Sequence, residues 1–517
     1  MAGHAPLTCL LLVLLLSING IATICYSAMG PPTPSTAPSG GYSQTVRTSA
    51  EFSLVHNAWW HAQRFYALLK PEDISNASII EEGLTTNAAQ ARLPIADLRR
   101  HCSNARVAFV PGTTLVMDVP FPSYPDHLGH WAELIVPIAN TLASGTWQEQ
   151  VQHPSLSSPL HLEGGSEAAG AKGGGLAGGG RPAEGAVQMG EAAKGARLGQ
   201  VLALNFNKHI SSWFQTTLEA AIQLDRGGAQ LSGLGFIDWA SLEEVDKLAW
   251  LHFENLLVVE GRYTHPQNRK GFAGTEHGDL WRYNKCERYV SSTVRVAFAT
   301  PEVGQAFRHT VYVQQGFPAP SATKAAAPPQ ALTLLLAAGE EWPGLHNLEE
   351  VYDMLSQVAQ DHGLQARQVT LTTDASMASH LSTISASMVL VGRHCSLMAN
   401  SMFMRPGTMV LELLPYKWEW AGLSQLYYNI TQSVGDIHHF AWRPQHYKFA
   451  IFANASDYKY HTWTPEECHA KECLSVMARQ SLLVDVPVVE AMLRRKLAAV
   501  LQGDSLASLR EPWPKAV

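Results

Sequence analysis

The sequence predicts an α/β protein whose C-terminal part folds as a doubly wound parallel sheet. Two observations carry this prediction. Residues 331–337 (ALTLLLA) form a short, wholly apolar run, which is typical of a parallel strand buried on both faces. From there to residue 414, apolar runs of this kind alternate with segments of helical periodicity, and this alternation is the βαβ pattern.

The remaining elements of this part follow in order. After the first strand, Asn347 is placed to cap a helix, with Glu350 at the capping-box position and Gly363 at the end. The next predicted elements are a strand at 368–372, a helix at 377–384, a strand at 388–391, a helix that follows GRHCS and ends at 403, and a strand at 408–414. A last helix begins at Asp485 and Pro487 and is closed by Gly503.

Composition limits the classes of protein that this chain can belong to. At about 100–200 residues per domain, 517 residues suggest about three domain-sized pieces. Hydrophobic residues make up 46 %, which excludes a wholly disordered chain. The net charge of −7 argues against a nucleic-acid-binding protein, which normally carries an excess of basic residues.

The N-terminus predicts entry into the secretory pathway. Residues 7–26 form the only long apolar run and contain no charge, so we expect a signal peptide or a signal-anchor within 1–28, and both remain open. Residues 29–50 are rich in Pro and are predicted to form a stem. The rest would then face the lumen of the Golgi or endoplasmic reticulum, as a single-pass type II membrane protein or a secreted-luminal one. Three glycosylation sequons, at Asn76, Asn429 and Asn454, fit this topology.

Two low-complexity segments divide the rest of the chain. Residues 151–199 are dominated by Gly and Ala and are predicted to be a disordered insertion, and 318–330 is predicted to be a linker. This gives an N-terminal domain, a C-terminal domain and a helical extension at 51–317, 331–465 and 466–517.

The cysteines suggest two disulfides. Two of the seven lie in the apolar run, which leaves an odd number. Cys468 and Cys473 are close enough in sequence for a local bridge, and Cys102 with Cys286 is a plausible long one. Cys395 would then be left as a free thiol.

The first candidate site is the junction at 391–396, where the third predicted C-terminal strand ends and a helix begins. Ligands of such sheets bind beyond the carboxyl ends of the strands, and a helix N-terminus favours a phosphate. Gly392 would allow a close backbone approach, Arg393, His394 and Ser396 could donate to a diphosphate, and Glu412 could accept from ribose hydroxyls. On spacing alone, an ordinary strand–helix turn with solvated polar residues is an equal alternative.

The second candidate site lies within 122–140. Trp131, Leu134, Ile135 and Ile138 have the spacing of a buried helix face, and the polar side chains gather at its start. His127, His130 and Glu133 are of the types that act as general bases, whereas helix capping and polar packing are the alternative.

Several motifs are absent from the sequence. It contains no D-x-D, the acidic pair that often holds a metal ion on a nucleotide-sugar, and we predict no metal site. It also lacks the G-x-S-x-G, H-E-x-x-H and P-loop motifs, and no G-x-G-x-x-G follows a predicted strand. The common hydrolase, zinc protease, kinase and dehydrogenase interpretations are therefore removed.

Three passages together resemble glycosyltransferase family 61. Residues 388–415 (MVLVGRHCSLMANSMFMRPGTMVLELLP) are similar to the family stretch "vlvGxHGAxLtNxlFmppgxxvvEixP". Residues 126–138 resemble its "HWlxExlPxl" segment, and 252–261 (HFENLLVVEG) resemble "CFenlvvG". The resemblance implies a GT-B-like fold of two Rossmann-like domains facing a cleft, and an inverting transferase that uses a UDP-sugar donor and usually no metal or other cofactor.

The resemblance also implies roles for individual residues. Gly392, His394, Ser396 and Asn400 would line the nucleotide site and Glu412 would touch the nucleoside, while His130 and Glu133 would face the acceptor and the reacting carbon, with His130 or Glu133 as the base. The sequence departs from the family at Cys395, where the family has Gly, and in LLLAAGEEWPGLHN (334–347), where the family has arginines.

These observations favour a transferase that moves N-acetylglucosamine or a pentose from a UDP-sugar to a protein-linked or polysaccharide acceptor. The two departures leave a second hypothesis, a catalytically inactive family member that binds a glycan or a partner protein. A third is a nucleotide-independent, lectin-like secreted protein. No nucleic-acid partner is expected, and contact with the membrane would be made through the N-terminal segment if it is not cleaved.

Overall fold

The computed structural model of the protein describes residues 44–47, 52–61, 64–69, 91–94, 106–118, 127–152, 198–204, 211–225, 235–238, 249–259, 296–320, 329–338, 344–418, 424–464, 467, 473–504 and 508–509. Several predicted features lie outside these residues, namely the N-terminal apolar run, most of the stem, the insertion between 153 and 197, the linker at 321–328, and Asn76, Cys102, Cys286 and Cys468.

The N-terminal half is built on a mixed eight-stranded sheet. Its order is β4-β3-β2-β8-β5-β6-β7, with β1 beside β2. The four strands β8, β5, β6 and β7 run parallel, whereas β2 is antiparallel to β1, β3 and β8. β1 falls inside the range predicted to be a stem, so the sheet begins before residue 51. The strands are β1 (Gln44–Arg47), β2 (Phe52–His61), β3 (Arg64–Leu69), β4 (Ala91–Pro94), β5 (Arg106–Asp118), β6 (Leu198–Leu204), β7 (Gly235–Asp238) and β8 (Ala249–Val259).

In the described residues the helices that accompany this sheet are α4 (Leu128–Ser144), α5 (Thr146–Gln152), α6 (Ser212–Gln223) and α10 (Pro301–Gln314). α4 is the helix predicted at the second candidate site. The ring of His127 caps its first turn by accepting from the backbone N–H of His130, and Gly145, at φ 68°, ends it in the left-handed region.

The C-terminal half contains a five-stranded parallel sheet, as predicted. Its order is β10-β9-β11-β12-β13, and every neighbouring pair is parallel. In chain order this is the 2-1-3-4-5 arrangement of a doubly wound sheet. The α/β class is therefore confirmed. The strands are β9 (Ala331–Ala337), β10 (Gln365–Leu371), β11 (Ser387–Arg393), β12 (Thr408–Leu413) and β13 (Ile437–Trp442).

Helices cover both faces of this sheet because its strands point apolar side chains to both sides. Val389 and Leu411 face α11 (Leu348–Asp361) and α16 (Val486–Leu501), whereas Leu390 and Val410 face α12 (Met377–Ser385), η5 (Ser396–Phe403) and α13 (Gln425–Ser433).

Two local features differ from the prediction. The segment from residue 396 is a 3₁₀ helix, η5, in which all eight side chains are buried. The side chain of Asn347 makes no cap hydrogen bond, because it pairs instead with the backbone N–H and carbonyl of Val484.

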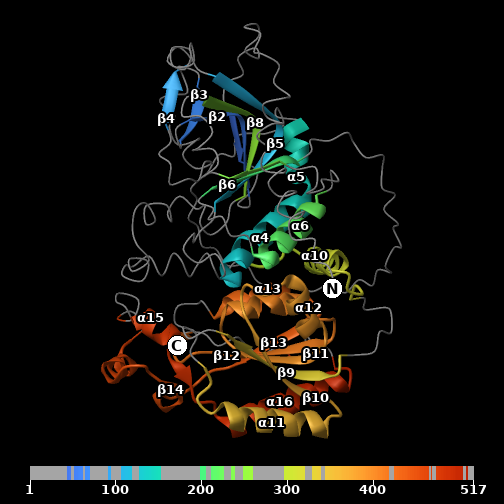
Figure 1. The fold of residues 1–517 in the computed structure, drawn as a ribbon, viewed down its shortest axis with the longest axis vertical. Helices are drawn as coiled ribbons and strands as arrows, with labels where there is room; N and C mark the ends of the chain where they lie inside the picture. The colour runs from blue at the N-terminus through green and yellow to red at the C-terminus, as the bar shows by residue number, and fades with distance from the viewer. Residues whose placement is uncertain are drawn as a thin grey trace, which may run out of the picture.

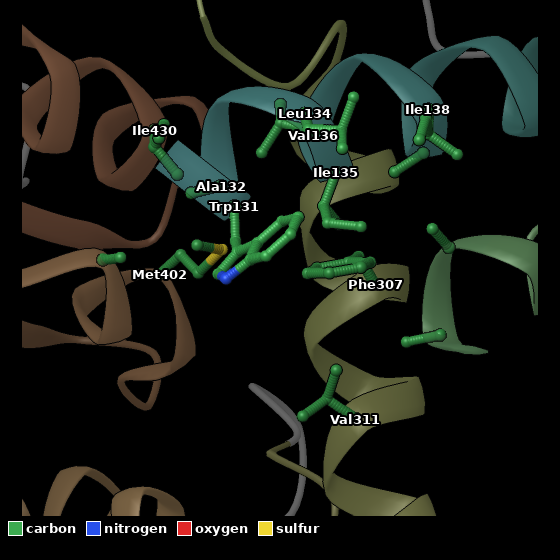
Figure 2. Packing of buried hydrophobic residues seen from close by; sticks show 14 of the residues in the cluster. Trp131, Ala132, Leu134, Ile135, Val136, Ile138, Phe307, Val311, Met402 and Ile430 are labelled. Carbon is green, nitrogen blue, oxygen red and sulfur yellow. The ribbon is translucent and has the colours of Figure 1, made fainter. Parts of the chain in front are cut away.

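The two halves share one hydrophobic core. Figure 1 shows α4, α6, α10, α12 and α13 lying between the two sheets. A single cluster of buried side chains runs from one face of the N-terminal sheet through these helices to the C-terminal sheet. Figure 2 shows its centre, where Trp131 and Ala132 of α4 lie near Met402 of η5 and Ile430 of α13, with Phe307 of α10 nearby.

The last part of the chain packs against the C-terminal sheet and its loops. Its elements are η7 (Tyr447–Phe449), β14 (Ala450–Ile451), η8 (Ala455–Thr462), α15 (Cys473–Ala478) and β15 (Ser481–Leu482). Cys473 is disulfide-bonded to a partner outside the described residues, and Cys395 is a free, buried thiol, as predicted for that residue. Within the described ranges, no helix combines the length and the hydropathy needed to cross a membrane.

Candidate functional site

The first candidate site lies where it was predicted, at the carboxyl end of β11. The order of the sheet changes direction here, because β9 has β10 on one side and β11 on the other. Gly392 has a packing reason to lack a side chain, since a β-carbon there would lie 2.8 Å from the sulfur of Met398. η5 therefore folds tightly over the end of the strand and begins directly after Cys395.

Glu412 and two histidines form a buried hydrogen-bonded cluster at this point. His394 Nδ1 and Glu412 Oε1 are in direct hydrogen-bond contact, and His439 Nε2 lies 2.9 Å from Glu412 Oε2. Burial alone would raise the pKa of Glu412, but charge interactions and hydrogen bonds with the two histidines lower it below its ordinary value. Both carboxylate oxygens are thus used inside the protein, which suits the orientation of a histidine better than contact with a ribose.

His394 is the member of this cluster that reaches the surface. Its side chain is 11 % exposed, whereas the side chains of Glu412 and His439 are fully buried. Its ring lies 5.0 Å from that of Tyr427 and 5.4 Å from that of Trp418, between centroids. Its position is therefore set from behind by the carboxylate and from the sides by two aromatic rings.

The second candidate site is the first two turns of α4. The rings of His127 and His130 are stacked with centroids 3.9 Å apart. His130 Nδ1 lies 3.3 Å from Glu133 Oε2, and the Glu133 side chain is only 1 % exposed against 18 % for His130. This is a second histidine–glutamate pair in which the histidine is the more exposed partner.

Tyr427 of α13 connects the two candidate sites. A β-carbon at Gly129, between His127 and His130, would lie 2.4 Å from the Tyr427 hydroxyl oxygen, so the tyrosine reaches the start of α4. Burial raises the pKa of Tyr427 well above its ordinary value, and electrostatic interactions with Cys395, Glu412 and Glu133 raise it further. Groups from both halves of the chain therefore surround one phenol, and the two predicted constellations form a single site.

Arg393 is directed away from this site. Its guanidinium donates to the carbonyl oxygens of Ala478 at 2.8 Å, Gln480 at 2.9 Å and His394 at 3.2 Å. Its pKa falls to about 10 because it is buried. Arg393 holds the end of α15 and the residues directly after it against β11, and these bonds take up donors that a phosphate would need.

Asn400 also has a structural environment. Its Oδ1 accepts from the indole N–H of Trp213 on α6 at 2.9 Å, and its Nδ2 lies 3.1 Å from His380 Nδ1 on α12. It is completely buried. Asn400 thus joins the N-terminal helices to the C-terminal ones.

Cys395 and Ser396 differ in what they offer to a ligand. Burial raises the pKa of Cys395 to about 11, so the residue is a neutral thiol at physiological pH. Ser396 is 1 % exposed, and its hydroxyl oxygen has no hydrogen-bond partner in the described part of the chain. A buried hydroxyl of this kind costs free energy unless something pairs with it.

Sequence reasoning missed Tyr427, His439 and Trp418. Each comes from a segment more than 20 residues away from the 391–396 turn, and none belongs to a spaced motif. Adjacency of β13 to β12 places His439 beside Glu412, and packing of α13 on α4 places Tyr427 beside Gly129. One signal was available, because two consecutive histidines in an apolar strand (IHHFAW) require polar partners inside the protein.

The two described sequons differ in accessibility. Asn454 is exposed at the start of η8, with its Nδ2 3.2 Å from Asp457 Oδ2. Asn429 lies half-buried within α13, and the hydroxyl of its sequon partner Thr431 is buried and bonded to Ser401 and to the carbonyl of Tyr427.

No protein-family model matches the chain, and no curated protein matches it.

Among the described side chains there is no group of three or more His, Cys, Asp or Glu residues placed to hold a metal ion.

Proposed function

We propose that the protein is an inverting, metal-independent glycosyltransferase of the GT-B-like type found in family 61. It would move N-acetylglucosamine or a pentose from a UDP-sugar to a protein-linked or polysaccharide acceptor in the Golgi or endoplasmic reticulum. The proposal places the nucleotide at the carboxyl end of the C-terminal sheet and the acceptor beside the start of α4.

The observation that carries the proposal is the meeting of two histidine–glutamate pairs around Tyr427. One pair, His130 with Glu133, comes from the N-terminal half, and the other, His394 with Glu412, comes from the C-terminal half. Two-substrate transfer requires groups from opposite sides of the reacting carbon, and a site made by both halves supplies them.

On the acceptor side, His130 is the better placed of the two predicted bases. Direct inverting displacement needs a group that takes the proton of the acceptor hydroxyl as its oxygen bonds to the anomeric carbon. His130 is the exposed member of its pair, and the buried Glu133 carboxylate lies on its Nδ1 side, where it can orient the ring. Stacking on His127 holds the ring from one face.

On the donor side, the start of η5 provides the diphosphate contacts. The N–H of Met398 in the first turn of η5 already donates to the carbonyl of Cys395, so the unpartnered Ser396 hydroxyl is the group that would gain a partner from an anion there. His394 lies next to this turn with part of its ring accessible. The absence of D-x-D from the sequence is consistent with a site in which side chains, rather than a metal ion, balance the charge of the leaving diphosphate.

A second function has one observation in its favour. Arg393, the only arginine in the 391–396 turn, uses its guanidinium to bind main-chain carbonyls. Together with the arginines missing from 334–347, this favours a family member that binds a glycan or a partner protein without transferring sugar.

A thermal-shift experiment on the full chain tests the donor site. The ligands are UDP, GDP, UDP-N-acetylglucosamine and UDP-xylose. A ligand present at 100 times its dissociation constant stabilises the folded protein by about 2.7 kcal/mol. For a domain of about 150–250 residues this corresponds to a rise in Tm of about 5–10 °C. We expect this shift with UDP and at least one UDP-sugar, and a much smaller one with GDP.

The matched variants are His394→Ala and His446→Ala. His446 is an exposed histidine on the same half whose ring accepts from the backbone N–H of Lys448, and its replacement should leave the shift unchanged. Loss of the shift in the His394 variant alone supports the donor site. No shift with any nucleotide at millimolar concentration would overturn it. A UDP-sugar shift without any donor turnover, even in the presence of glycan acceptors, would favour the non-catalytic alternative.

A further inference from the structure

Trp418, four residues beyond the end of the apolar run of β12, carries a buried indole N–H that is not hydrogen-bonded. Its side chain belongs to a residue that is 7 % exposed, and its Nε1 has no hydrogen-bond partner in the described part of the chain. A buried tryptophan N–H usually finds a partner, because an unpaired donor keeps the full cost of its lost hydration. An acceptor supplied by a ligand would remove this cost.

This N–H belongs to the candidate donor site. The ring of Trp418 lies 5.4 Å from the ring of His394, between centroids. Ser396 follows His394 by two residues, and its buried hydroxyl is also unpaired among the described residues. Two neutral donors that lack acceptors therefore adjoin the histidine of the Glu412 cluster that reaches the surface.

The turn that carries Trp418 is held by contacts within the protein. Its backbone N–H donates to the carbonyl of Pro415 at 3.1 Å. The buried ammonium of Lys417 donates to the carbonyls of His461 at 2.6 Å and Trp463 at 2.9 Å. Lys417 has φ 61°, a left-handed conformation that a non-glycine residue keeps where its surroundings hold it. The indole is thus placed by contacts that need no ligand.

Two cationic side chains near this turn are bonded to main-chain oxygens instead of facing a ligand. Lys417 binds the carbonyls at the end of η8, and Arg393 binds those of Ala478 and Gln480. The indole and the Ser396 hydroxyl remain as donors without acceptors. A neutral donor still makes a strong hydrogen bond when its acceptor is a charged oxygen, such as that of a phosphate.

We propose that Trp418 is a donor-binding residue whose indole N–H, together with the Ser396 hydroxyl, donates to oxygens of the nucleotide-sugar diphosphate. This inference rests on the proposed transferase function and deepens it. It gives the diphosphate two hydrogen bonds from neutral groups where the sequence lacks the expected arginines.

Calorimetric titration of the full chain with UDP and with uridine tests this inference. Trp418→Phe keeps an aromatic ring and removes the N–H. Because a hydrogen bond to a charged group is lost, UDP binding should weaken about tenfold or more. Uridine has no phosphate, so its binding should stay unchanged. Ser396→Ala should give the same pattern.

Trp147→Phe is the matched control. Trp147 on α5 is fully buried, and its indole N–H also lacks a partner among the described residues. Its replacement should leave the affinity for both ligands unchanged. An unchanged affinity of Trp418→Phe for UDP overturns the inference. An equal loss for UDP and uridine, or an equal loss in Trp147→Phe, would show an effect of packing and also overturns it.

A second measurement keeps the test decisive if Trp418→Phe does not fold. In the wild-type chain labelled with ¹⁵N-tryptophan, an indole N–H that gains a hydrogen bond to a phosphate oxygen shifts downfield in the NMR spectrum. We expect an indole signal to shift in this way with UDP and not with uridine. UDP binding without such a shift overturns the inference and leaves the donor site standing. A wild-type protein that binds no nucleotide overturns the proposed function itself.

Discussion

Arg308 of α10 joins the two halves of the protein through a buried ion pair, and its replacement should be strongly destabilising. Its guanidinium donates to Asp436 Oδ1 at 2.8 Å, to Asp436 Oδ2 at 2.5 Å and to the carbonyl of Met404 at 2.8 Å. The side chain of Arg308 is 2 % exposed and that of Asp436 is 21 % exposed. The pair is bidentate and largely shielded from water.

The expected magnitude follows from this geometry. Removing one partner of a buried ion pair costs about 3–5 kcal/mol, because the other charge stays buried without compensation. Asp436 keeps some contact with water, so the lower end, about 3 kcal/mol, applies to Arg308→Met, which preserves the length of the side chain. At about 2–4 °C per kcal/mol, Tm should fall by about 6–12 °C.

Thermal unfolding of the full chain, followed by circular dichroism, measures this loss. The matched control is Arg494→Met on α16, where the arginine pairs with Glu490 and Asp361 at the surface. Exposed ion pairs contribute little, so the control should melt close to the wild type. Equal shifts for the two variants would refute the argument that burial gives the Arg308 pair its importance.

Two further predictions concern the site. Gly129→Ala should destabilise the protein, because overpacking against the Tyr427 hydroxyl typically costs about 1–3 kcal/mol. Melting curves should show that the loss disappears in a Tyr427→Phe background, and equal losses in both backgrounds would contradict the contact. Cys395 should resist iodoacetamide in the native protein at about pH 7.5, because it is buried and its pKa rises to about 11. Mass spectrometry should detect labelling only after unfolding, and rapid native labelling would show that the thiol is accessible.

Much of the C-terminal half could be predicted from the sequence. The apolar runs at 331–337 and 388–391 became β9 and β11, because a strand buried on both faces needs apolar residues at every position. The start of α4 was also anticipated, since the spacing of Trp131 and Ile135 marks one face of a helix. The same spacing does not predict which elements pack against the apolar face of α4.

The N-terminal sheet was harder to predict. Its order interleaves strands from distant parts of the chain, so β2 lies beside β8 and β5 lies between β8 and β6. A mixed sheet of this kind depends on pairings that local periodicity does not record. The inclusion of β1, which lies in the range predicted to be a stem, has the same cause.

For the candidate site, the sequence by itself determined the chemical groups. It predicted a polar turn after a buried strand, with His394 and Ser396 in it, and a helix that begins with His130 and Glu133. These predictions follow from local rules, because a strand end and a helix start are defined by a few consecutive residues.

Only the tertiary structure decided how these groups are used. It brought Tyr427 against Gly129, enclosed Glu412 between two histidines and directed Arg393 toward carbonyl oxygens. Burial and hydrogen-bond partners determine which histidine reaches the surface and which arginine is available to a ligand. Both depend on contacts between segments that are far apart in the chain, and no local pattern of residues encodes them.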